Sequence, residues 1–76
     1  MEIKKIQTIR ARFDDGFYCD ITQEKNNGVC EFWLYRNGYG FALFMFGCTA
    51  ETEQEKIELA AANIKQYIPI FEKSCE

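Results

Sequence analysis

Residues 29–48 read VCEFWLYRNGYGFALFMFGC, and this stretch decides the fold of the 76-residue chain. Asn37-Gly38 at its centre favours a two-residue type I′ turn, because both residue types tolerate a positive φ. The segments 29–36 and 39–47 are therefore predicted to pair as a β-hairpin. Apolar side chains occupy both faces of this hairpin, although a small core needs only one. We expect one face to pack in the core and the other to meet a different surface.

Two further strands are predicted before the hairpin. Asp14-Asp15-Gly16 separates residues 6–13 from residues 17–24, and Asn26-Asn27-Gly28 separates residues 17–24 from the hairpin. Asp, Asn and Gly favour tight turns through their side-chain hydrogen bonds and their tolerance of positive φ. Because every connection is short, the four strands should form an antiparallel meander.

A helix is predicted after the strands. Thr52-Glu53-Gln54-Glu55 has the capping-box pattern, and Thr49 is the alternative cap. Pro69 cannot donate its backbone hydrogen bond and should end or kink the helix near Ile68. Lys56 is expected to face solvent, while one apolar stripe faces the sheet: Ile57, Ala60, Ala61, Ile64, Tyr67, Ile68 and Phe71. The prediction is one α+β domain over residues 1–76, a four-stranded antiparallel meander followed by a C-terminal helix on one face (ββββα).

Counting outward from the turns assigns each side chain to a face of the sheet. The register places Ala11 opposite Cys19 and Arg10 opposite Asp20. Across Asn37-Gly38 it places Leu34 opposite Phe41, Trp33 opposite Ala42 and Cys30 opposite Met45. One face is almost wholly apolar and should receive the helix: Ile9, Ala11, Phe13, Phe17, Cys19, Ile21, Cys30, Phe32, Leu34, Phe41, Leu43 and Met45.

The opposite face divides into a polar half on the first two strands and an aromatic half on the last two. A single helix covers only one face, and exposed apolar patches usually mark interaction sites. Two alternatives to an interaction site stay open. The aromatic side chains could serve to stabilise the sheet, as cross-strand aromatic pairs do, or the tail after Pro69 could cover them. The strand at 39–47 has no charge or proline to block pairing with a second chain. The predicted interaction surface consists of Trp33, Tyr35, Phe44, Phe46, Tyr18 and Arg12.

Composition and motifs narrow the function classes. The formal charge of −3 supplies no basic field for a phosphate backbone, so nucleic acid is not the expected partner. The chain has no histidine and no C-x-x-C pair, so we expect no metal, no cofactor and no enzymatic activity. Three of the four cysteines, Cys19, Cys30 and Cys48, fall inside or at the end of predicted strands as small apolar fillers. No segment has the length of a membrane span or the pattern of a signal peptide, which predicts a cytoplasmic protein.

Residues 47–67 begin with Gly47-Cys48-Thr49 and contain Ala60, Ala61, Asn63 and Tyr67. This segment resembles the strand-to-helix segment of HicB-type antitoxins. The proline-containing turn usual before that glycine is absent, and no function is carried over. The sequence predicts a protein-interaction module that forms a homodimer or binds another protein and acts as a small regulator or inhibitor. The alternative is a single-stranded nucleic-acid or small-ligand binder on the same aromatic face.

Overall fold

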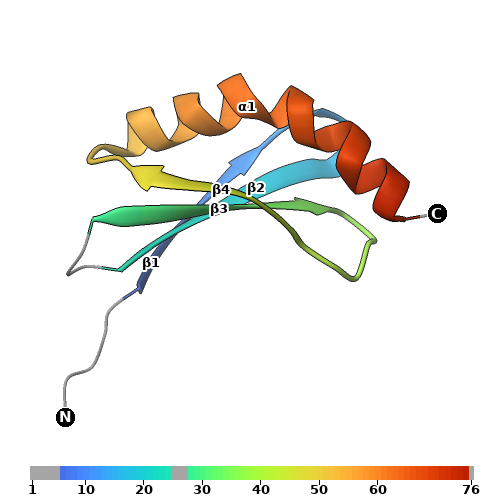
Figure 1. Ribbon diagram of the computed structural model, residues 1–76, viewed down its shortest axis with the longest axis horizontal. Coiled ribbons are helices and arrows are strands. Elements are labelled where there is room, and N and C mark those ends of the chain that lie inside the picture. Colours follow the sequence, from blue (N-terminus) through green and yellow to red (C-terminus); the bar gives the residue numbers. More distant parts are fainter. Residues whose placement is uncertain (1–5, 25–27, 76) are drawn as a thin grey trace, which may run out of the picture.

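The computed structural model describes residues 6–24 and 28–75. Four strands, β1 (Ile6–Arg12), β2 (Phe17–Glu24), β3 (Val29–Arg36) and β4 (Leu43–Thr49), form one antiparallel sheet in the order β1-β2-β3-β4. A single helix, α1 (Glu53–Ser74), follows them and crosses one face of the sheet (Figure 1). The predicted ββββα fold is confirmed.

β1 and β2 have the predicted register, and β3 shares their predicted faces. Ala11 pairs with Cys19 and Arg10 with Asp20, and β2 aligns Cys19 with Leu34 on β3. The connection η1 (Asp14–Gly16) closes the first hairpin, with positive φ at Asp15 and Gly16. Aspartate and glycine are among the residues that adopt this region at least cost. The turn predicted at Asn26-Asn27 lies outside the described residues.

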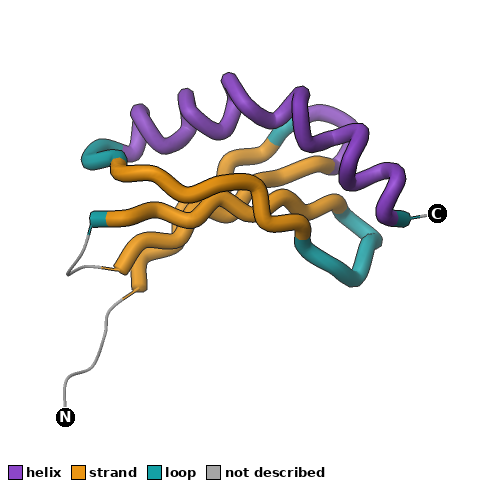
Figure 2. Tube along the Cα trace, viewed as in Figure 1, coloured by secondary structure: helices purple, strands orange, loops and turns teal. Residues whose placement is uncertain are grey.

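The β3–β4 connection differs from the prediction. Tyr39 N donates to Arg36 O as a tight turn requires, but of the two central residues only Gly38 has a positive φ. A type I′ turn needs positive φ at both positions. The hairpin therefore opens into a loop, and β4 begins at Leu43 rather than Tyr39. Figure 2 shows this loop beyond the sheet, at the end where α1 finishes.

A β-bulge in β4 changes the predicted faces. Trp33 pairs with Phe44, but the next pair along β3 is Phe32 with Phe46, which leaves Met45 as the extra residue. Because a bulge inserts one residue, side chains beyond it change faces. The placement of Phe46 on the outer face is therefore wrong, and Phe46 stacks on Phe32 in the core. The three predicted pairings across this hairpin are also wrong. Leu34 pairs with Leu43 instead of Phe41, Trp33 with Phe44 instead of Ala42, and Cys30 with Cys48 instead of Met45.

The helix begins as predicted but ends later. Thr52 Oγ1 accepts from Glu55 N at 3.1 Å, which identifies Thr52 as the N-cap. The helix continues through Pro69 to Ser74, so of the two predicted effects of Pro69 the end near Ile68 is wrong, and Phe71 in the last turns is completely buried. The tail after Pro69 therefore packs on the same side as the rest of the helix and leaves the outer face uncovered.

The helix stripe is rotated relative to the prediction. Ala60, Ile64 and Phe71 are buried as expected, but Ile57 and Ala61 are exposed. Lys56, predicted to face solvent, is 4% exposed. Its long aliphatic stem is buried, and Nζ donates to Gln23 Oε1 at 2.6 Å.

Candidate functional site

The outer face of the sheet, opposite α1, carries four aromatic side chains that together form what we call the outer patch: Tyr18, Trp33, Tyr35 and Phe44. Strand alternation places them there, because Cys19, Leu34 and Met45, their neighbours along the strands, are buried beneath the helix. Within residues 6–24 and 28–75, no segment crosses this face (Figure 1).

The outer patch consists of two aromatic pairs. Trp33 and Phe44 meet edge to face with ring centroids 5.1 Å apart. Phe44 is 46% exposed, although it is one of the larger apolar side chains of the protein. Tyr18 and Tyr35 lie parallel, with centroids also 5.1 Å apart. Aromatic pairs of these geometries are mutually favourable and form a preordered surface.

An ion pair borders the outer patch on β1 and β2. Arg10 Nε donates to Asp20 Oδ1 at 2.8 Å, and Nη2 donates to Oδ2 at 3.1 Å. The guanidinium carbon also lies 4.4 Å from the centroid of the Tyr18 ring. The hydrogen bond to Asp20 raises the pKa of Arg10 above its usual range. The positive charge is therefore already matched by a carboxylate of the same protein.

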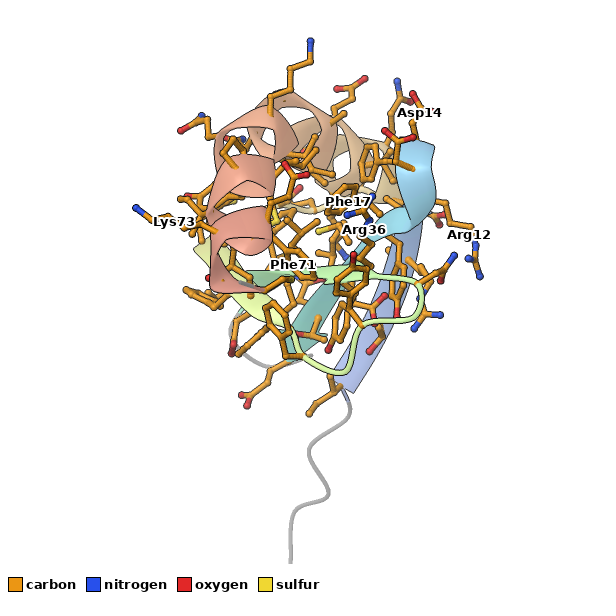
Figure 3. All side chains as sticks on the ribbon, turned by 90° about the vertical axis from the view of Figure 1, so that its right-hand side faces the viewer. Arg12, Asp14, Phe17, Arg36, Phe71 and Lys73 are labelled. Atoms are coloured by element: carbon orange, nitrogen blue, oxygen red, sulfur yellow. The ribbon has the colours of Figure 1, made fainter. Side chains whose placement is uncertain are left out.

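The structure brings together five of the six predicted surface residues. Trp33, Tyr35, Phe44 and Tyr18 form the outer patch, and the exposed Arg12 pairs with Tyr18 and points away from the helix at its rim (Figure 3). Phe46 is the exception, for the reason given above. Arg10 was predicted only as the cross-strand partner of Asp20, and its stacking on Tyr18 makes it part of the same surface.

The two fully buried cysteines lie in the core. Cys19 and Cys30 are 0% exposed, and burial raises the pKa of the Cys19 thiol to about 12. A thiol with such a pKa is protonated at neutral pH and is a poor nucleophile. Among the described residues no cluster of three His, Cys, Asp or Glu side chains could hold a metal ion. The described helix also lacks the apolar length that crossing a membrane requires.

Comparison of the chain with protein-family models, with curated proteins and with solved structures found no match.

Proposed function

We propose that this chain is a protein-interaction module that associates with a second copy of itself through the outer patch, and that it acts as a small regulator or inhibitor. The observation that carries the proposal is the pair of half-buried Trp33 and exposed Phe44 on a sheet face that no described segment covers. Aromatic side chains are enriched in the buried centres of protein interfaces.

The ion pair beside the outer patch suits a self-complementary contact. In a twofold dimer the same surface meets itself, so an unmatched charge near the axis would face its own copy. Arg10 and Asp20 neutralise each other within one chain. Two copies can therefore approach without opposing like charges at this position.

The size of the outer sheet face determines the expected affinity of the dimer. Strands of seven or eight residues, four abreast, give a face of roughly 20 Å by 25 Å. Such a face is at the small end of the areas that specific interfaces bury. The dimer is therefore expected to dissociate on dilution rather than to be obligate.

The test is the mass in solution over a dilution series, by light scattering or sedimentation. The wild-type chain should move between 8.9 kDa and twice that mass. Phe44→Glu should remain folded by circular dichroism and stay monomeric, because the dimer would place two glutamates at the interface. The double variant Trp33→Ser, Phe44→Ser should also be a folded monomer.

The matched control is Ile70→Ser, which removes an exposed apolar side chain from the helix instead of the outer patch. This variant should dimerise as the wild type does. A Phe44→Glu chain that keeps the wild-type mass would refute dimerisation through this face.

The same variants test binding of single-stranded nucleic acid on this face. Such binders combine stacking aromatics with a positive groove, whereas Asp20 already matches the charge of Arg10. We expect no salt-dependent binding of an oligothymidine to the wild-type chain. Binding that weakens with salt and is lost in Phe44→Glu would favour the nucleic-acid alternative instead.

A further inference from the structure

A second feature lies on the helix side of the sheet, away from the outer patch. The η1 connection and the middle of α1 line an open cleft of about 560 Å³. Its apolar walls come from Phe13 and Phe17 next to η1 and from Ile64 and Ile68 on the helix. This volume falls within the range of small-molecule sites, which combine apolar walls with a few placed polar groups.

Arg36 is the one charged side chain of this cleft that is partly buried. It is the last residue of β3, and Nε donates to the Asp15 carbonyl oxygen at 3.1 Å. The guanidinium carbon lies 4.5 Å from the ring centroid of Phe17 and 5.2 Å from that of Tyr39. In Figure 3, Arg36 lies beside Phe17 in the middle of this end of the protein. These contacts hold the guanidinium in one orientation.

The guanidinium keeps donors for a ligand. Arginine has five N–H groups, and in the described chain only the Nε group of Arg36 meets an acceptor. The one ion pair among the described residues is that of Arg10 with Asp20, so no described carboxylate neutralises Arg36. A fixed, partly desolvated guanidinium with open Nη groups recognises a carboxylate by two parallel hydrogen bonds.

The neighbouring turns support this arrangement. Asn37 N donates to the Gly16 carbonyl oxygen at 2.9 Å, which ties the β3–β4 turn to η1 on either side of Arg36. Gly16 has a φ of +80°, and a Cβ there would lie 3.5 Å from Asn37 Cβ. The Arg36 backbone and its acceptor at Asp15 are therefore held by connected turns.

The other charges of the cleft lie at its rim. They are all exposed, so water and salt screen them: Arg12, Asp14, Asp15, Lys65 and Glu72. Arg36 is screened less, because aromatic rings cover its guanidinium. The charge that a ligand meets inside the cleft is therefore positive.

We propose that this cleft binds a small monocarboxylate with an apolar body. Arg36 holds the carboxylate, and the apolar body lies against the partly buried Phe13 and Ile68. The site is separate from the outer patch, and its occupation does not require a dimer.

The test uses 3-phenylpropanoate as the probe and 3-phenylpropanamide as its uncharged match. Both are titrated into the ¹⁵N-labelled wild-type chain and followed by amide chemical shifts. 3-Phenylpropanoate should shift the backbone N–H signals of Gly16 and Ala61. 3-Phenylpropanamide should bind about tenfold more weakly or not at all. Equal binding of the two compounds, no shifts up to the solubility limit, or shifts confined to the Trp33 indole would overturn the proposal.

Variants give a second measurement. Arg36→Gln should weaken binding of the acid by about tenfold or more, whereas Arg10→Gln, on the outer face, should leave it unchanged. Unchanged binding in a folded Arg36→Gln chain would also overturn the proposal. The comparison of 3-phenylpropanoate with 3-phenylpropanamide needs only the wild-type chain. It therefore tests the proposal even if the Arg36→Gln chain does not fold.

Discussion

Phe32 on β3 and Phe46 on β4 stack across the sheet, with ring centroids 4.3 Å apart and planes inclined by 15°. This contact exists because Met45 is inserted as an extra residue between the Phe44 and Phe46 pairings. Two phenylalanines only two positions apart thus lie on opposite faces of the sheet. Phe46 completes the core, and Phe44 remains on the outer patch.

Replacing these two phenylalanines should have unequal effects on stability. Phe46→Ala removes a ring that packs on Phe32 and Tyr67, so we expect a loss of about 2–4 kcal/mol in the free energy of unfolding. Phe44→Ala removes a ring that is 46% exposed and should cost less than about 1 kcal/mol in the monomer. Denaturant unfolding measures both losses, at a protein concentration low enough for the chain to be monomeric. Equal losses would contradict the bulge.

The burial of Phe71 predicts a second inequality. Its ring meets Phe17 at 5.6 Å, Tyr39 at 5.8 Å and Phe41 at 4.5 Å between centroids. Phe71→Ala should therefore cost about 3–5 kcal/mol, a large part of the roughly 5–10 kcal/mol that stabilises a small domain. Ile70→Ala, one residue earlier and 48% exposed, should change stability by less than about 1 kcal/mol. Thermal unfolding of the two variants measures this difference. Equal losses of stability would show that the last turns of the helix do not pack on the sheet.

The sequence predicted the arrangement of β1 to β3 because two independent signals agree there. The loops contain residues suited to tight turns, and apolar and polar residues alternate along the strands, as Cys19-Asp20-Ile21 shows. The register of β4 was not predictable in this way. Phe44-Met45-Phe46 is apolar at every position, so no polar side chain marks the inserted residue or the face that each ring takes.

The errors at the Asn37-Gly38 turn and at the end of the helix have a common physical origin. Tyr39 and Phe41 leave the strand and pack on Phe71, which lies far away in the sequence. Local turn preference favours a continuous hairpin, and the local effect of Pro69 favours an early end to the helix. Burial of Phe71 in an aromatic cluster outweighs both. The helical spacing of Ala60, Ile64, Ile68 and Phe71 was the signal in the sequence that could have indicated this.

Gln23 connects three segments at the other end of the sheet. Its Nε2 donates to Gly28 O at 2.9 Å and to Ala50 O at 3.1 Å, and its Oε1 accepts from the buried Lys56. Gln23→Ala removes these bonds and leaves Lys56 Nζ without its acceptor. At about 1 kcal/mol for each bond, we expect a loss of about 2–3 kcal/mol.

Gln54→Ala is the matched control for this prediction. Gln54 is exposed and its side chain reaches only Glu58 on the same helix, so the change should stay within about 0.5 kcal/mol. Denaturant unfolding of both variants gives the comparison. Equal effects would show that the Gln23 contacts add nothing to stability.

Cys19 gives the protein a dependence of stability on alkaline pH. Burial raises the pKa of this thiol from an ordinary 9.0 to about 12. Between these values the unfolded chain loses the thiol proton while the folded chain keeps it, so ionisation favours unfolding. Below pH 9 the thiol is protonated in both states, and the free energy of unfolding does not depend on its ionisation. As the pH rises from 9 towards 12, the free energy of unfolding decreases by up to about 1.4 kcal/mol per pH unit.

Urea unfolding at several pH values between 8 and 11 measures this slope. Cys19→Ala leaves a small cavity and lowers the whole curve, but its stability should fall less steeply with pH than that of the wild type. Cys48, whose pKa is also raised by burial, still contributes in that variant. Cys75→Ala removes an exposed thiol and serves as the control. If Cys19→Ala and Cys75→Ala decline with the same slope, the Cys19 thiol does not stay protonated in the folded core.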